Sequence, residues 1–236
     1  MKIPAIHGYI DRRILINYTL DPDVASALLP APFRPLLHNG RAIMGICLIR
    51  LKNIKPKGFN DMLGISSENG AHRFAVEWDE NGITKQGVYI PRRDTSSYIN
   101  TIAGGRLFPG KHYKAKFSVD EQAGNYNVGF VSNDATTLSI SASQSNLFPQ
   151  TSIFENLESA SAFFQNGSLG YTPAGKGFDG VKLHTLSWQV SALAVHSVQS
   201  SYFEDEIRFP KGSVVFDNAL LMKNIEHEWQ MLQRIP

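Results

Sequence analysis

Hydrophobic and polar residues alternate along most of the chain. The alternation is clearest in stretches rich in β-branched and aromatic residues, namely 14–20, 42–51, 73–78, 87–91, 113–119, 126–131, 137–142, 181–198 and 212–216. Because successive side chains of a strand point to opposite faces, this period of two predicts a mainly β protein. Two stretches, 42–51 and 191–198, are almost continuously apolar, which predicts strands that are buried on both faces.

Three stretches break the alternation and predict helices. Residues 21–30 begin with an Asp-Pro pair, suited to a cap and a first turn, and end at a proline. Residues 152–167 open with Ser152 and Glu155, the two members of a capping box, and close at a glycine. Residues 217–232 start at a capping aspartate and carry apolar residues at helical spacing, namely Leu221, Ile225, Trp229 and Leu232.

The order of these elements predicts one domain over residues 1–236. No shift in composition marks a linker, and mainly β chains of this length are commonly single domains. The widest loop, residues 169–180, contains four glycines, and we interpret it as a mobile loop beside the active site.

The composition is typical of a soluble globular protein. Of the 236 residues, 42% are apolar and 19% are charged, which is ample for a core. The 23 basic and 21 acidic residues form no long runs, so neither nucleic acid nor an anionic membrane is an expected partner. The single cysteine, Cys47, excludes an intramolecular disulfide and agrees with a reducing cytosol. The chain shows neither a signal-peptide core nor an apolar run of membrane-spanning length, so we expect a cytoplasmic protein.

One stretch comes close to a phosphate-binding loop. Residues 105–112 read G-R-L-F-P-G-K-H, whereas that loop reads G-x-x-x-x-G-K-[S/T] and needs a strand before it and a helix after it. Here His112 replaces the hydroxyl residue, and the residues that follow alternate as a strand. We therefore expect no nucleotide at Lys111, whose amine stays a candidate for other chemistry.

Metal binding has no support in the spacing of ligand residues. The seven histidines show neither H-x-x-x-H nor H-x-H. Cys47 stands alone in an apolar strand, where we interpret it as a core residue. No metal and no other cofactor is expected.

Charged residues gather at two strand ends. Glu68 lies in a turn-like stretch just before a strand that Arg73 begins. The pair is either a salt-bridged loop or a carboxylate and a guanidinium that line a pocket, where they would serve acid–base chemistry and anion binding. A second group, residues 92–94, follows another strand and is interpreted as solvated.

Four segments, in order along the chain, resemble those of the acetoacetate decarboxylase superfamily. Residues 17–35 resemble its opening strand, helix and proline turn, and residues 64–82 resemble its Tyr-Thr-Glu loop and following strand. Residues 103–112, AGGRLFPGKH, resemble the segment that carries its Schiff-base lysine, and residues 194–222 resemble its terminal Val-His strand pair and helix. The resemblance covers nearly the whole chain and is closest to the superfamily's uncharacterised YqjF-like branch.

The resemblance implies a closed, largely antiparallel β-barrel with an interior pocket. In these decarboxylases a lysine condenses with a β-keto acid, and the protonated imine draws off electrons as carbon dioxide leaves. Counted back from the strand that follows, Lys111 is the nucleophile and His112 its electrostatic neighbour. Counted forward from Pro109 without a gap, Gly110 takes the nucleophile's place and Lys111 that of the neighbour.

The other site residues implied by the resemblance are charged. Glu68 would shuttle protons, and Arg73 or Arg106 would anchor the carboxylate of the substrate. Three functions stay open. One is an imine-forming lyase, hydrolase or dehydratase acting on a small keto acid. The second is a non-catalytic barrel that binds a small apolar or carboxylated ligand, and the third is a structural protein whose pocket is filled by side chains. The sequence also leaves open whether the chain forms a homo-oligomer.

Strand alternation indicates which lysine would face such a pocket. In residues 112–119 the polar face carries Lys114, and the opposite, apolar face contains Tyr113 and Ala115. Lys111 has the parity of the apolar face. We therefore expect Lys111, rather than Lys114, to be the amine of the pocket.

Overall fold

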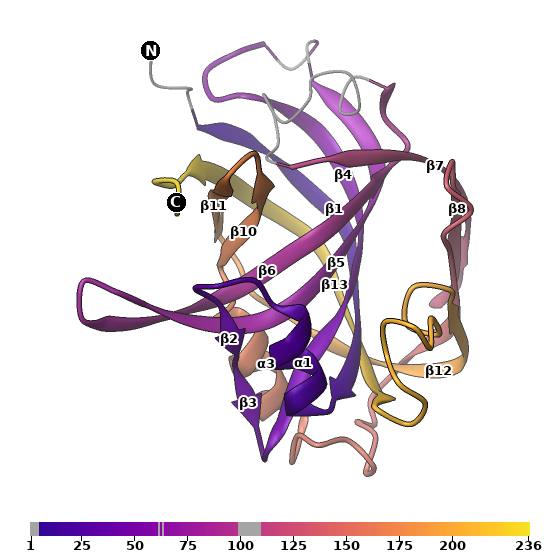
Figure 1. Cartoon of the computed structure of the whole chain (residues 1–236). Helices are drawn as coiled ribbons and strands as arrows, with labels where there is room; N and C mark the ends of the chain where they lie inside the picture. Colours follow the sequence, from indigo (N-terminus) through magenta and orange to yellow (C-terminus); the bar gives the residue numbers. More distant parts are fainter. Residues whose placement is uncertain (1–4, 61, 63, 99–109) are drawn as a thin grey trace.

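The computed structural model describes residues 5–60, 62, 64–98 and 110–236. Within them the chain forms two helices and thirteen strands (Figure 1). In chain order these are β1 (Ile6–Leu20), α1 (Pro22–Leu28), β2 (Arg34–Pro35), β3 (Leu37–His38), β4 (Arg41–Pro56), β5 (Ile65–Glu80), β6 (Ile83–Thr95), β7 (His112–Gln122), β8 (Asn125–Ser132), β9 (Thr137–Ser145), α3 (Leu157–Gln165), β10 (Leu169–Ala174), β11 (Gly177–Thr185), β12 (Ser191–Ser200) and β13 (Val214–Met231). No helix of the described residues is long and apolar enough to cross a membrane.

Nine strands of one continuous sheet close into a ring. Their order is β6-β7-β8-β9-β12-β13-β1-β4-β5, and the pairing of β5 with β6 closes the ring. Most neighbours are antiparallel, whereas β6 pairs in parallel with β7 and with β10. The mainly β, closed-barrel fold that the sequence predicts is confirmed.

A second, smaller ring of seven strands shares a wall with the first. The hairpin of β10 and β11 pairs with β6 on one side and with the end of β13 on the other. Strands β13, β1, β4, β5 and β6 therefore belong to both rings, with β10 and β11 on one side of this wall and β7, β8 and β12 on the other (Figure 1). The expectation of a mobile loop over residues 169–180 is wrong, because these residues form most of this hairpin.

The shared wall separates two hydrophobic cores. Ile14 and Ile16 point into the nine-strand ring, whereas Leu15 and Cys47 point to the other face, where Phe164 of α3 packs. All residues of β4 from 42 to 48 are buried, as expected for a strand covered on both faces. The same expectation is wrong for β12, because it lies outside the shared wall and alternate side chains of its central part are exposed.

The first helix begins as the sequence predicts. The carboxylate of Asp21 accepts hydrogen bonds from the backbone N–H groups of Asp23 and Val24, which satisfies two donors of the first turn. Proline at the first helical position costs no hydrogen bond there. This short helix connects β1 to the strands that follow.

The prediction of a C-terminal helix over residues 217–232 is wrong, because nearly all of this segment belongs to β13. Leu221, Ile225 and Trp229 recur every four residues, a spacing that fits the period of two as well as the helical one. Asn224 interrupts the strand with a left-handed φ of 54°. Leu221 belongs to the core inside the nine-strand ring, and Ile225 belongs to the core on the opposite face.

The second helix starts later than expected. Its capping box is formed by Asn156 and Ser159, not by Ser152 and Glu155. The hydroxyl of Ser152 instead donates to the carboxylate of Asp217 at 2.7 Å. The aspartate that the sequence assigned to a helix cap therefore holds the segment that leads into α3.

Candidate functional site

A cavity of about 120 Å³ lies inside the seven-strand ring, and all seven strands contribute to its lining. A single water needs roughly 10–15 Å³, so the cavity is large enough for a small molecule. Much of the lining is apolar, including Ile10, Ile90, Leu183 and Trp229. Its charged and titratable residues come from five strands and are Arg13, Cys47, Arg73, Arg93, Asp94 and His112. The carboxylate of Asp94 is bound by Arg92.

Cys47 lies between two of these arginines. The Nε of Arg73 donates to the Sγ of Cys47 at 3.1 Å, and a terminal nitrogen of Arg13 lies 3.6 Å from the same sulfur. Arg73 is only 4% exposed, and it also donates to the Oδ1 of Asn17 at 2.5 Å. Its guanidinium lies over the ring of Phe164, 4.9 Å from the ring centroid. These contacts hold Arg73 in one position against the sulfur.

The remaining arginine, Arg93, has its Nε buried without a hydrogen-bond partner, and so has Arg13. Burial lowers the pKa of Arg93 to about 10, and Cys47 opposes this shift. Among the described residues, none of Arg13, Arg73 and Arg93 forms an ion pair with a carboxylate. Arg73 is buried, and Arg13 and Arg93 are half-buried. Charges removed from water are normally paired, so these three guanidiniums leave positive charge around the cavity without a carboxylate partner.

Two pairs of consecutive arginines explain why some arginines have carboxylate partners and others do not. Arg12 and Arg13 are consecutive on β1, and Arg92 and Arg93 are consecutive on β6, so the members of each pair point to opposite faces of the shared wall. On the face of the nine-strand ring, Arg12 binds two glutamates, and Arg92 binds Asp94 at 2.7 Å and a second aspartate. The second member of each pair faces the cavity. The interpretation of residues 92–94 as solvated is wrong, because both Arg92 and Asp94 are buried.

The thiol of Cys47 is itself acidified by this environment. Burial alone would raise its pKa, but the charges of Arg73 and Arg13 and their hydrogen bonds lower it below its ordinary value. Cys47 is 3% exposed and lines the cavity. The sequence interpretation of a packed core cysteine thus describes its burial but not its charged surroundings.

His112 completes the polar lining. Its Nδ1 lies 3.2 Å from the carbonyl oxygen of Gly110. Burial lowers the pKa of His112 to about 4, and the charge of Arg93 acts in the same direction. The imidazole is therefore neutral near pH 7 and adds a polar group, but no further charge, to the cavity.

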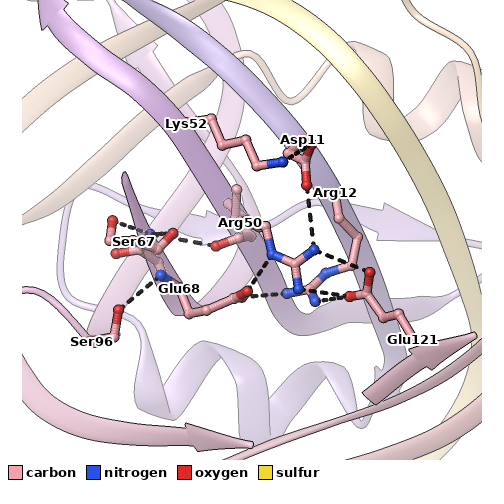
Figure 2. Close-up of polar contacts among 10 residues, drawn as sticks. Asp11, Arg12, Arg50, Lys52, Ser67, Glu68, Ser96 and Glu121 are labelled. Atoms are coloured by element: carbon pink, nitrogen blue, oxygen red, sulfur yellow. Dashed lines mark hydrogen bonds and ion pairs between the residues drawn. The ribbon is translucent and has the colours of Figure 1, made fainter. Parts of the chain in front are cut away.

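Glu68 lies on the other face of the wall from Arg73. Both residues belong to β5, and five positions separate them, so they point in opposite directions. Figure 2 shows Glu68 in a network with Arg12, Arg50 and Glu121. The carboxylate of Glu68 lies 2.5 Å from Arg12 and 2.6 Å from Arg50, and Arg12 also binds Glu121. Glu68 is not among the residues that line the cavity.

Lys111 is exposed and directly precedes β7, and it does not line the cavity either. Its Nζ lies 4.7 Å from the centroid of the Tyr113 ring. Tyr113 lines a separate, open depression of about 390 Å³, together with Arg92 and Tyr202. Arg106, the other expected carboxylate anchor, lies outside the described residues.

The structure thus brings together two of the site residues predicted from the sequence, Arg73 and His112. It adds Arg13, Cys47 and Arg93. The signal that could have found them in the sequence is a charged or reactive residue within an apolar strand. In the described residues no group of three histidine, cysteine or acidic side chains is arranged to hold a metal ion.

The family model of DUF2071, described as an uncharacterized conserved protein, matches residues 10–216. The chain belongs to this family. The match includes the strands that carry Arg13, Cys47, Arg73, Arg93 and His112. No curated protein sequence matches the chain.

Solved structures confirm the resemblance to acetoacetate decarboxylases at the level of the fold. Acetoacetate decarboxylase from Legionella pneumophila is 12% identical, with a TM-score of 0.61 over 98% of this chain and 88% of that one. An acetoacetate decarboxylase-like enzyme from Sphingomonas wittichii RW1 is 12% identical, with a TM-score of 0.58 over 100% and 94% of the two chains. The enduracididine biosynthesis enzyme MppR complexed with pyruvate is 11% identical, with a TM-score of 0.56 over 99% and 90%. At such identities the relatives are distant.

Proposed function

We propose that this member of DUF2071 binds a small carboxylate in the cavity of the seven-strand ring. The observation that carries the proposal is the contrast within the arginine pairs. Arg12 and Arg92 bind carboxylates of the protein, whereas Arg13 and Arg93 face the cavity without one. A guanidinium presents donors in a fork that matches a carboxylate, and a buried cation gains most from such a partner.

The shape and the remaining lining fit a small organic acid better than an inorganic anion. Apolar side chains such as Ile90 and Leu183 would cover a short carbon skeleton, while the arginines take the charged end. The complex of MppR with pyruvate is an example of a small keto acid bound by a relative of the same fold. A keto acid of a few carbon atoms is therefore the ligand class that we propose.

Binding is tested by thermal and urea unfolding with pyruvate, with acetoacetate and with the neutral analogue pyruvamide. A carboxylate present at about 100 times its Kd should add about 2.7 kcal/mol to the free energy of unfolding, because it binds only the folded chain. Pyruvamide should add much less, because it lacks the charge that the guanidiniums attract.

Arg93→Gln and Arg92→Gln form a matched pair for this test, since they make the same change at adjacent residues on opposite faces. Arg93→Gln should remove most of the increase in the free energy of unfolding that carboxylates cause. It should also leave the ligand-free protein as stable or more stable, because it removes a cation whose Nε is buried without a partner. Arg92→Gln should lower the stability but keep the increment. An increment of wild-type size in Arg93→Gln would refute the proposal.

A second candidate is imine formation between Lys111 and a keto acid, with Glu68 moving protons and Arg73 or Arg106 holding the carboxylate. One observation favours it: Lys111 directly precedes His112, whose ring lines the cavity. A shift of one residue at the start of β7 would exchange the directions of these two side chains. The exposed position of Lys111 makes this candidate the weaker of the two.

The imine candidate is tested by incubation with pyruvate or acetoacetate and borohydride, followed by peptide mass mapping. Imine catalysis predicts a reduced adduct concentrated on Lys111 and absent from the Lys111→Arg variant. Lys114, on the same strand, serves as the internal control. Adducts spread over the surface lysines to the extent seen in an unfolded sample would leave carboxylate binding as the function of the cavity.

A further inference from the structure

The geometry of Cys47 suggests more than a buried counter-charge for two arginines. Its sulfur is at the wall of the cavity, 3.1 Å from the Nε of Arg73 and 3.6 Å from Arg13. Guanidiniums at these distances stabilise a thiolate, which is the nucleophilic form of cysteine. The chain has no other cysteine, so any thiol chemistry can be assigned to this residue.

We propose that Cys47 is a nucleophile of the cavity, and that it reacts with carboxylates whose electrophilic carbon is directly bonded to the carboxylate. The inference rests on the carboxylate-binding function proposed above. Arginines and sulfur line the same small cavity, so a carboxylate held by Arg93 or Arg13 would have its neighbouring carbon close to the sulfur. Carboxylates of this kind include the 2-oxo acids.

The charges of the site support a thiolate and a carboxylate at the same time. Arg13, Arg73 and Arg93 carry three positive charges, and no carboxylate among the described residues pairs with them. The one carboxylate of the described lining, Asp94, is bound by Arg92 instead. A thiolate supplies one negative charge and a bound carboxylate a second, so the three guanidiniums would still outnumber the negative charges. Repulsion between the two anions is thus offset by the guanidiniums around them.

The chemical step balances without a further reactant. With a 2-oxo acid, the sulfur of Cys47 bonds to the carbonyl carbon, the electron pair of the C=O bond moves to its oxygen, and that oxygen takes up the proton that the thiol released. The product is a hemithioketal, and nothing is oxidised or reduced. With iodoacetate as a probe, the sulfur bonds to the methylene carbon, iodide leaves and the thiol proton goes to solvent.

The first measurement compares the rates at which iodoacetate and iodoacetamide alkylate Cys47, followed by intact mass. The urea-unfolded chain gives the intrinsic ratio of the two rates. In the folded protein the ratio should shift towards iodoacetate by about tenfold or more, because the arginine-lined cavity concentrates the charged reagent. Arg93→Gln should reduce this shift, and pyruvate should slow the alkylation. A folded-state ratio equal to that of the unfolded chain, or a sulfur that does not react, would overturn the proposal.

The second measurement separates this proposal from carboxylate binding itself. Pyruvate and lactate differ only at the carbon that the sulfur would attack, and lactate has no carbonyl there. The wild type should bind pyruvate several-fold more tightly than lactate, and Cys47→Ser should lose this preference. Equal affinities in the wild type would refute the role of Cys47 while leaving the carboxylate site intact. Failure of both acids to bind would instead refute the carboxylate-binding function.

Discussion

Replacing Arg12 with methionine is expected to lower the free energy of unfolding by about 3–5 kcal/mol. The side chain of Arg12 is 1% exposed and binds both Glu68 and Glu121 (Figure 2). Methionine fills a similar volume but leaves two carboxylates with Arg50 as their remaining arginine partner in the network. Two half-buried carboxylates would then share one arginine, and losing the fully buried partner is costly, which gives the variant its large effect. Urea unfolding near neutral pH measures it.

Arg34→Met is the matched control. Arg34 also binds two carboxylates, those of Glu77 and Asp79, but it lies on an exposed surface, where such pairs contribute about 0–1 kcal/mol. In the Arg12→Met background, Glu121→Gln should recover part of the loss, because it removes one unpaired charge. If Arg12→Met were no more harmful than Arg34→Met, the network would not be the structural element that its burial indicates.

The boundary of β5 explains why the sequence left two alternatives open for Glu68, a salt bridge or a pocket shared with Arg73. Glu68 was interpreted as a turn residue before a strand, but it belongs to β5, which begins at Ile65. Within a strand, the odd separation between Glu68 and Arg73 puts them on opposite faces. Once the strand boundary is known, the parity follows from the sequence alone. The boundary is the uncertain step, because Gly70 and Asn69 favour a turn as much as an extended strand.

Most of the fold could be predicted because period-two alternation marks strands directly. It failed where the apolar spacing fits a helix as well as a strand, as in β13, whose apolar residues recur every four positions. It also failed in the β10–β11 hairpin, because four glycines hid the strands on either side of a short turn. The prediction of burial on both faces was right for β4 and wrong for β12. Apolar content does not reveal which strands lie in the wall shared by the two rings.

The candidate site could be predicted only in part. Arg73 was predicted as a charged residue that begins a strand, and His112 through the resemblance to acetoacetate decarboxylases; both line the cavity. Arg13, Cys47 and Arg93 come from three other strands, and only the closure of the sheet brings them together. Local patterns carry no information about such long-range pairings. Consecutive arginines on an apolar strand are nevertheless a usable signal, because one of the two must point to the buried face.

Acidification from about pH 7.5 to about pH 5 is expected to destabilise the folded chain by about 2 kcal/mol for each histidine that is buried in the neutral form. Burial lowers the pKa of His227 to about 4, and the charge of Arg13 acts in the same direction. Burial likewise lowers the pKa of His112 to about 4. In the unfolded chain both have a pKa of about 6.5. Between these values the unfolded chain binds more protons than the folded one, so the free energy of unfolding falls as the pH falls.

His227→Gln tests the origin of this dependence. Glutamine does not titrate, so the variant should lose about 2 kcal/mol less than the wild type over the same pH interval, whatever its stability near pH 7.5. His227→Asn is a second test, because asparagine does not titrate either and should reduce the pH dependence to the same extent. The measurement is urea unfolding at a series of pH values above about 5, where most carboxylates stay ionised in both states. Parallel curves for wild type and His227→Gln would contradict the prediction, since they would mean that His227 binds protons equally in the folded and unfolded chain.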